Sequence, residues 1–229
     1  YHLDNEASDS DYKVFVAPDF IDLYQGREKF SLPIGYDEEH ESALDVRAFD
    51  KRLRAANFNS IELLFSKDAK LWDEALANYY TLAREAYANH YVAYKWYAFY
   101  ASVRGHCLHN LFKRNHPSLN SSRKGEARSL WMLNFVSYVA AHGFVINDNA
   151  WNAPEVYELP RRYRFEEPEI LTEDDWMTMF ANVESKVHKE LARKPYNELQ
   201  CQQFENDMQL AMQKLIATSL RQELEDKYA

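Results

Sequence analysis

Apolar residues recur at helical spacing through the last two thirds of the chain. From Asp68 onward they fall at i, i+3, i+4 and i+7, as in the run from Leu71 to Ala86, and this period indicates helices with one buried face. Residues 91–103 are dense in Tyr, Trp and Phe, and we interpret them as a helix buried between other helices rather than as a stacking platform for bases. Residues 196–228 predict one more long helix with a spaced apolar stripe.

Start and stop signals set the limits of several of these helices. One helix is expected to end at His142-Gly143, since Gly is common just past a helix C-terminus. Residues 172–175 resemble a capping box in which Asp replaces the usual Glu, and they predict a helix that ends before Pro195. Between these two helices, residues 147–168 are rich in Asn, Pro and Arg and predict a long connection.

The first third of the chain has a different pattern. Residues 12–18 are β-branched and aromatic and predict a strand that a proline ends. Residues 19–41 are punctuated by Gly, Pro and acidic residues and predict irregular structure. Residues 42–47 predict a short strand with an acid in its middle, which leads into a helix. The apolar run 61–66 is too short to assign by its period, and a buried strand and a helix turn are both open.

This order of elements, strands first and helices afterwards, predicts the fold class α+β. We expect a small mixed β-sheet with helices over residues 1–66 and a mostly helical domain over residues 67–229. Hydrophobic residues make up 46% of the chain, which is ample for a core.

Composition narrows the functional classes. The chain has only 5 Gly and no Gly-rich dinucleotide or P-loop motif, which disfavours those nucleotide folds. Its 2 Cys form neither a disulfide framework nor a zinc spacing, which fits a reducing, cytoplasmic location. No apolar run is long enough for a membrane span, so we expect no membrane partner. The formal net charge of −9 makes non-specific binding of nucleic acid unfavourable.

Asp9 and Asp11 are the first candidates for chemistry. They are two residues apart at the start of the first predicted strand, so both project from one face with Cα atoms about 6.6 Å apart. Two bare carboxylates at that separation repel by roughly 2 to 3 kcal/mol at an effective dielectric near 20, and a hard cation such as Mg²⁺ or Mn²⁺ between them relieves this repulsion. The alternative is a solvated strand start with Ser8 and Asp9 in a turn.

Asp45 lies in the next predicted strand. If the two strands pair, the three carboxylates converge on one patch, which is the arrangement that a two-metal phosphoryl-transfer site needs.

Three motifs together resemble the predicted nucleotidyltransferases of the DNA polymerase β superfamily, in the bacterial and phage branch with a helical C-terminal half. They are Ser8-Asp9-x-Asp11-Tyr12, Asp45-Val46-Arg47 and Asn57-x-Asn59-x-x-Glu62-Leu63-Leu64-Phe65. The resemblance makes residues 1–66 the catalytic core. Its first residues look like the segment that follows the Gly-Ser signature of the family, so we expect this core to be truncated before Tyr1.

What this resemblance implies is transfer of a nucleoside monophosphate from a nucleoside triphosphate to an acceptor hydroxyl, with release of pyrophosphate. The cofactors it implies are two ions of Mg²⁺ or Mn²⁺. By the same resemblance Asp9 and Asp11 bind both ions, and Asp45 completes the catalytic-ion site and helps to activate the acceptor hydroxyl. Ser8 is then expected to contact phosphate.

Four further residues are candidates for nucleotide binding. Lys124 and Arg128 are at i and i+4 in a segment that resembles the basic helix of the family, and the resemblance assigns them to neutralising the triphosphate. An ordinary solvated helix face is the alternative for both. Asn59 and Glu62 are candidates to shape the nucleotide pocket, with packing or a turn as the alternative.

The acceptor is open between an RNA 3′ end, as in tRNA, and a hydroxyl of a protein side chain. Residues 113–128 and an arginine cluster favour RNA because they offer charges to a phosphate backbone, whereas the overall acidity leans against it. The cluster comprises Arg161, Arg162 and Arg164.

Two other classes of function compete with the enzyme. One is a non-catalytic module that binds a nucleotide or a partner on the same fold. The other is self-association through the long C-terminal helix, whose alternative is packing on its own domain; the oligomeric state is open.

His106 and His109 are at i and i+3, with Cys107 between them. No further ligands follow at a metal-binding spacing, so we expect a core or surface role for these residues.

Overall fold

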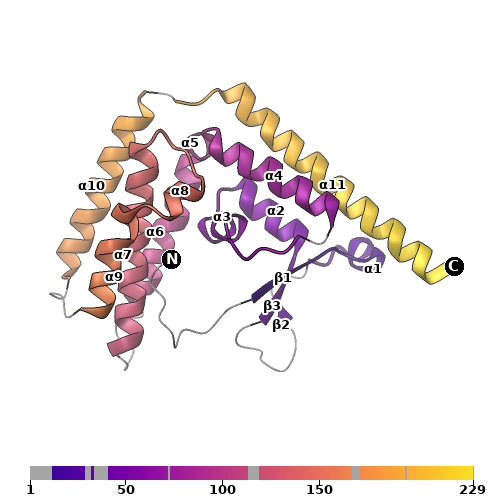
Figure 1. Cartoon of the computed structure of the whole chain (residues 1–229), viewed down its shortest axis with the longest axis horizontal. Helices are drawn as coiled ribbons and strands as arrows, with labels where there is room; N and C mark the ends of the chain where they lie inside the picture. The colour runs from indigo at the N-terminus through magenta and orange to yellow at the C-terminus, as the bar shows by residue number, and fades with distance from the viewer. Residues whose placement is uncertain are drawn as a thin grey trace.

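Most of the described chain is helical, and a small sheet lies at the edge of the helices, at the bottom of the view in Figure 1. The computed structural model describes residues 12–28, 32–33, 41–71, 73–112, 119–166, 171–193 and 195–228.

The sheet contains β1 (Tyr12–Val16), β2 (Leu32–Pro33) and β3 (Glu41–Asp45) in the order β1-β3-β2. β1 and β3 run parallel, with Tyr12 opposite Glu41 and Val16 opposite Asp45. β2 pairs antiparallel with β3. The chain therefore has an α+β layout with a small mixed sheet. The first strand and the strand of Asp45, whose pairing the metal-site hypothesis required, are paired in parallel.

One prediction for this part of the chain is wrong, and a second is correct except for where the strand ends. The segment 19–41, predicted as irregular, contains β2 and the short helix α1 (Phe20–Tyr24). The strand predicted over 42–47 ends at Asp45, because this carboxylate caps the next helix, α2 (Val46–Arg54), by accepting the Arg47 N–H at 2.8 Å.

The ambiguous apolar run 61–66 belongs to a helix, α3 (Phe58–Leu64). Asn57 caps it and accepts the N–H of Ser60 at 3.2 Å. The buried residues of α3 include Phe58, Ile61 and Leu64, whose spacing of three places them on one side of a helix.

The rest of the described chain is helical. Its helices are α4 (Glu74–Ala88), α5 (Tyr91–Tyr94), α6 (Trp96–Phe112), α7 (Leu119–Ala141), α8 (Asp148–Trp151), α9 (Pro154–Phe165), α10 (Glu173–Leu191) and α11 (Glu198–Tyr228).

Several of the predicted helix limits are confirmed. Thr172 and Asp175 form the reciprocal capping box that opens α10. Gly143, with φ of 76°, adopts the left-handed conformation just after α7 that glycine accepts without strain.

The predicted connection over 147–168 is wrong, because α8 and most of α9 lie within it. The polar and proline residues that suggested a loop are helix starts. Asn147 caps α8 by accepting the backbone N–H groups of Asn149 and Ala150, and Pro154 occupies the first turn of α9, where a missing N–H costs nothing.

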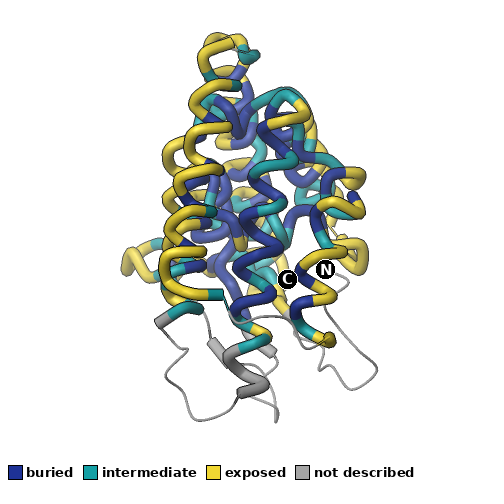
Figure 2. Tube along the Cα trace, turned by 90° about the vertical axis from the view of Figure 1, so that its left-hand side faces the viewer, coloured by how far each residue is buried: buried dark blue, intermediate teal, exposed yellow. Residues whose placement is uncertain are grey.

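α7 is central to the helical side of the molecule, where it packs against α6, α9 and α10. α11 crosses to the other side and packs along α4, with further contacts to α2 and α5 (Figure 1). In the perpendicular view, the buried residues lie on the inner faces of the helices, in the middle of the molecule, and the exposed residues lie on the outer faces (Figure 2).

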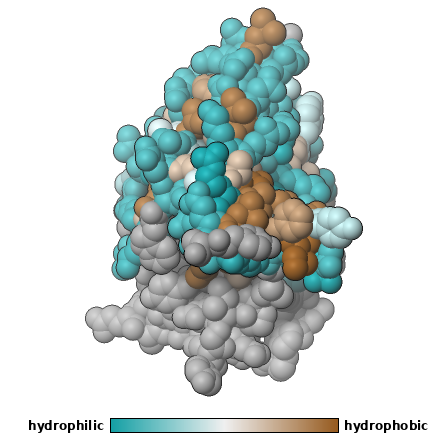
Figure 3. Space-filling model, turned by 90° about the vertical axis from the view of Figure 1, so that its right-hand side faces the viewer, coloured by the Kyte–Doolittle hydropathy of each residue, from teal (hydrophilic) through white to brown (hydrophobic). Residues whose placement is uncertain are grey.

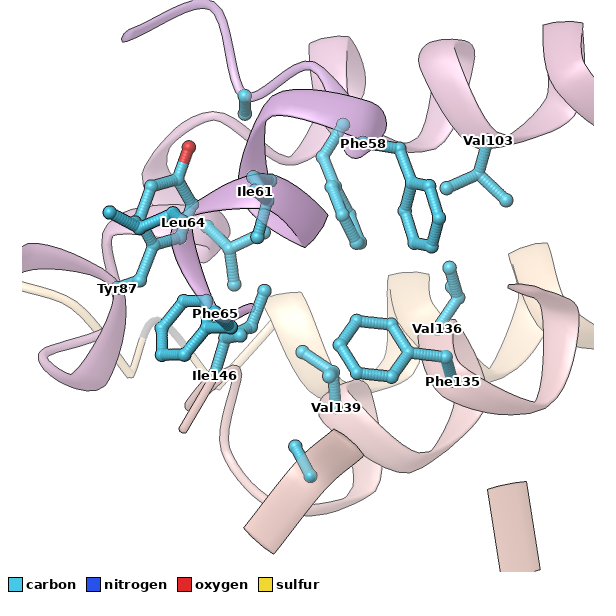
Figure 4. Packing of buried hydrophobic residues seen from close by; sticks show 14 of the residues in the cluster. Phe58, Ile61, Leu64, Phe65, Tyr87, Val103, Phe135, Val136, Val139 and Ile146 are labelled. Atoms are coloured by element: carbon cyan, nitrogen blue, oxygen red, sulfur yellow. The ribbon is translucent and has the colours of Figure 1, made fainter. Parts of the chain in front are cut away.

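One hydrophobic cluster extends from Leu44 at the sheet to Leu215 on α11. Phe58, which is fully buried, projects from α3 toward α6 and α7, where Val103, Phe135 and Val136 lie (Figure 4). The cluster contains residues from both sides of position 66, so the predicted parts 1–66 and 67–229 share a core; their division into two domains stays a prediction.

The apolar stripe of α11 packs on its own chain. Its buried members are Cys201, Phe204, Met208, Met212 and Leu215. Exposed apolar side chains instead gather on the side of the molecule that is on the right in Figure 1 and faces the viewer in Figure 3. On that side α1 carries the exposed Phe20, Ile21 and Tyr24. The backbone N–H of Phe20 donates to Glu223 at 3.0 Å and links α1 to the last turns of α11.

We expect Met208→Ala to lower the free energy of unfolding by about 2 to 4 kcal/mol, because it opens a cavity where the fully buried Met208 packs. Urea denaturation followed by circular dichroism measures this. Leu224→Ala is the matched control, since Leu224 on the same helix is 51% exposed, and its effect should stay within about 0.5 kcal/mol. Light scattering that shows dissociation of an oligomer in Met208→Ala would contradict packing of the stripe within one chain.

Candidate functional site

Asp45, the predicted third metal ligand, ends β3 and is fully buried. Its Oδ2 accepts from Nη2 of Arg47 at 2.7 Å, and its Oδ1 accepts from Nε of the same guanidinium at 3.0 Å. The hydrogen bond to Asp45 raises the pKa of Arg47, against the lowering effect of its burial. Arg47 also donates to the carbonyl oxygen of Arg27.

This pairing bears on the fit of a metal ion. A bidentate guanidinium and a capped N–H engage both oxygens of the Asp45 carboxylate, and a divalent cation needs the same lone pairs. In this arrangement the Asp45 side chain does not fit the role of a magnesium ligand. The pairing of Asp45 with Arg47 was predictable from the sequence, because Arg47 follows only two residues after an acid at a helix start.

Ser8, Asp9 and Asp11 lie outside the described residues. Tyr12, the first described residue of β1, is opposite Glu41, four residues along the strand from the level of Asp45, or about 13 Å. Convergence of the three carboxylates therefore depends on the course of residues 8–11. Within the described part of the chain, no group of three or more ligating His, Cys, Asp or Glu side chains is present.

Two of the predicted nucleotide-binding residues come together. Arg128 on α7 donates from Nη2 to Oε2 of Glu62 on α3 at 3.2 Å. The Arg128 side chain is 43% exposed, whereas that of Glu62 is only 13% exposed. The second oxygen of Glu62, Oε1, is buried without a hydrogen-bond partner among the described residues. Two helices far apart in the sequence, α3 and α7, thus contribute to one ion pair. Its carboxylate is largely buried and its guanidinium is accessible.

Burial raises the pKa of Glu62 to about 7, and the nearby charge of Arg128 opposes this shift only in part. The charge of Arg128 also acts on His106 of α6. Burial lowers the pKa of His106, and the neighbouring charges of Arg128 and His109 lower it further. Arg128 therefore influences both a carboxyl group whose pKa is near neutrality and a histidine whose pKa is lowered.

The other two nucleotide-binding candidates lie on the same helices. Lys124 is exposed on α7, one turn before Arg128, and Asn59 is exposed on α3, one turn before Glu62. Both positions face solvent, but no hydrogen bond of the described chain links either of them to the Glu62–Arg128 pair.

Glu126 lies between Lys124 and Arg128 in sequence but is turned away from their face. It is 4% exposed and accepts a hydrogen bond from the hydroxyl of Tyr163 on α9. The exposed side of this part of α7 therefore carries two cations, Lys124 and Arg128.

Among the described residues, His106, Cys107 and His109 belong to no group of three or more ligating side chains. Cys107 is fully buried, its Sγ donates to the carbonyl oxygen of Ser129 at 3.7 Å, and burial raises its pKa to about 12. His109 is exposed. The expected core and surface roles of these residues are confirmed.

Ser102 is a residue that the motifs did not single out. Its hydroxyl on α6 accepts the backbone N–H of Phe58 at 3.1 Å and the side-chain amide of Asn57 at 3.3 Å. It thereby holds the start of α3 against α6. A lone serine within an aromatic helix carries no sequence signal for this contact.

The chain matches no protein-family model, no curated protein and no solved structure in the three comparisons made. Among its described helices, none combines the length and the apolar character that crossing a membrane requires.

The raised pKa of Glu62 gives a measurable dependence of stability on pH. The folded chain holds this proton more tightly than the unfolded chain, whose Glu has its ordinary pKa of 4.5. The contribution to stability is therefore full below the unfolded pKa and is lost as the pH rises through about 7.

We expect the free energy of unfolding to fall between about pH 5 and about pH 8 by more in the unmodified protein than in Glu62→Gln, with a difference of at most about 3 kcal/mol. Urea titrations at a series of pH values measure it. Glu158→Gln, at an exposed position of α9, should follow the unmodified protein. Parallel curves for Glu62→Gln and the unmodified protein would refute the raised pKa.

Proposed function

We propose that this protein is a nucleotide-binding module, with the α7 face that carries Lys124 and Arg128 as its phosphate-binding surface. The observation that carries this proposal is the contact of Arg128 with Glu62, at 3.2 Å. A guanidinium held against a largely buried carboxylate keeps a fixed orientation at the surface, and its planar fork suits the oxygens of a phosphate.

The charges around this face support the same function. Lys124 adds a flexible cation one helical turn away, and Glu126 is engaged by Tyr163 on the other side of α7. Protonation of Glu62, whose pKa is about 7, weakens its hold on Arg128 and leaves that cation more attractive to an anion. Binding of phosphate and of a proton at Glu62 should therefore favour each other.

We expect ATP to bind this module at least about 10-fold more weakly after Arg128→Gln, since a charged hydrogen bond contributes roughly 1.5 to 3 kcal/mol. Lys124→Gln leaves the Glu62–Arg128 pair intact and should also weaken binding. Isothermal calorimetry with ATP, with and without Mg²⁺, measures both. Arg193→Gln, which removes an exposed arginine paired with Glu190 on α10, is the matched control. Equal affinity in all four proteins would exclude this surface.

Nucleotidyl transfer is the second candidate, and it extends the first. It is supported by the parallel pairing of β1 with β3, because Asp45 then lies on the strand beside the one that Ser8-Asp9-x-Asp11 precedes in the sequence. Two ions of Mg²⁺ or Mn²⁺ would supply Lewis-acid chemistry there. Since Asp45 is paired with Arg47, we assign no step to them. On this hypothesis the fold is of the nucleotidyltransferase type.

The packing of α7 on α9 bears on the acceptor. The hydroxyl of Tyr163 contacts Glu126, so the arginine-rich end of α9 lies beside the basic segment of α7. Arg161 and Arg162 are exposed there. Cations from two helices at one end of the bundle favour RNA over a protein side chain as the acceptor.

Turnover separates the two candidates. If the protein is a transferase, Asp9→Asn together with Asp11→Asn should abolish the release of pyrophosphate from ATP in the presence of Mg²⁺ and RNA. ATP binding without Mg²⁺ should persist in this double variant. A pyrophosphate assay on both proteins, with Asp19→Asn as the control for a nearby exposed acid, gives the answer. Pyrophosphate release that the double variant leaves unchanged would exclude catalysis by these acids.

A further inference from the structure

A pocket of about 370 Å³ opens beside the loop that joins α3 to α4. Its walls come from that loop, from α4 and from the start of α8, and its apolar part includes Leu64 and Leu71. Leu64 is fully buried at the end of α3, and Leu71 is 37% exposed. The size falls in the range of small-ligand sites in proteins. None of its lining residues belongs to the Glu62–Arg128 pair.

Tyr80 supplies a hydroxyl group on a firmly packed ring to this pocket. Its side chain is only 4% exposed, and its ring stacks on Phe49 at 5.9 Å between centroids, with the edge of Phe15 at 6.3 Å. The ring is therefore held in place from two sides. Its hydroxyl makes no hydrogen bond to any described residue, and it is not among the buried side-chain atoms that lack a partner, so the oxygen is open to the pocket.

Two cations line the same pocket. Arg84 lies over the ring of Phe65, with Cζ 4.8 Å from the centroid, and forms an ion pair with Asp148. Lys67 donates to Oδ1 of Asn152 at 2.9 Å. These contacts orient both side chains, and the two positive charges outnumber the single negative charge of Asp148 in the lining.

The hydroxyl of Tyr80 remains a donor at neutral pH. Burial raises its pKa to about 12, while the neighbouring charge of Arg84 opposes the shift. Arg84 thus acts electrostatically on the same hydroxyl that lacks a partner. A fork of guanidinium donors, an ammonium group and a phenol then face one volume with apolar walls. Three donor groups around one volume, two of them cationic, suit an anion.

We propose that this pocket binds a small organic anion, with its phosphate or carboxylate group between Tyr80, Arg84 and Lys67 and its apolar body against Leu64 and Leu71. This inference goes beyond nucleotide binding at α7 and does not rest on it. Asp148 sets the selectivity, because it partly neutralises Arg84 and disfavours highly charged polyphosphates over ligands with a single anionic group.

Phenyl phosphate is the probe, with phenol and inorganic phosphate as its two halves. We expect phenyl phosphate to bind at least about 10-fold more tightly than either half, because only the whole probe satisfies both the donors and the apolar wall. Titration followed by the backbone amide signals of Ser66 and Leu71 in nitrogen-15 NMR spectra measures the affinity. Equal affinity for inorganic phosphate, or no shift of these signals, would overturn the proposal.

Variants test the assigned donors. Tyr80→Phe keeps the packed ring and removes only the hydroxyl, and it should weaken phenyl phosphate binding about 5-fold. Lys67→Gln alters an exposed side chain and should weaken binding by a similar factor without affecting folding. Arg84→Gln should weaken it at least about 10-fold. Arg221→Gln, at an exposed position of α11, is the control. Unchanged affinity in Tyr80→Phe and Lys67→Gln would show that the pocket does not bind in this way.

Discussion

The insertion of Phe58 between α6 and α7 is the contact on which the rest of the structure depends. Its ring lies 5.6 Å from Trp131 and 5.9 Å from Phe135, both in edge-to-face geometry, and it is fully buried. An aromatic side chain of this size gains most of its stabilisation from such burial. Because α3 is tied to the sheet through α2 in the chain, this one ring connects the sheet side to the helical side and determines where α3 and its polar residues lie.

The polar residues of α2 and α3 follow from that placement. Asp50 is buried on α2 and is bonded by Arg54 at 2.7 Å and by the hydroxyl of Tyr79 at 2.9 Å. Asp45, one turn earlier, has Arg47, and Glu62 on α3 has Arg128. Buried carboxylates demand such partners because charge is costly to remove from water. Glu62 differs from the other two in that its second oxygen is buried and lacks a described partner. Burial raises the pKa of Glu62 to about 7.

Local signals in the sequence predicted much of the fold. The capping box at Thr172, the strand predicted over residues 12–18 and the long C-terminal helix follow from short-range chemistry. All three are present, although the strand ends at Val16. The helices within 147–168 were missed because Asn and Pro occur both in loops and at helix starts, and only the surrounding structure distinguishes these cases.

For the candidate site, the choice of Glu62 and Arg128 rested on motif position, yet their contact depends on tertiary packing that no spacing encodes. The pairing of β1 with the strand of Asp45 was only a condition of the metal-site hypothesis, because two strand-like segments do not determine their own partners. The engagement of Asp45 by Arg47 was overlooked, because the acid was read as a strand residue rather than as a helix cap. The pocket beside Tyr80 is lined by a loop and by two helices that are far apart in the chain, so the order of residues alone does not predict it.

The aromatic interior around Phe58 also has an optical consequence. The indole rings of Trp131 on α7 and Trp151 on α8 stack with their centroids 5.7 Å apart and an angle of 29° between their planes. Because the electronic transitions of two stacked indoles couple, the near-ultraviolet circular dichroism of this pair reports on whether α7 and α8 are packed together.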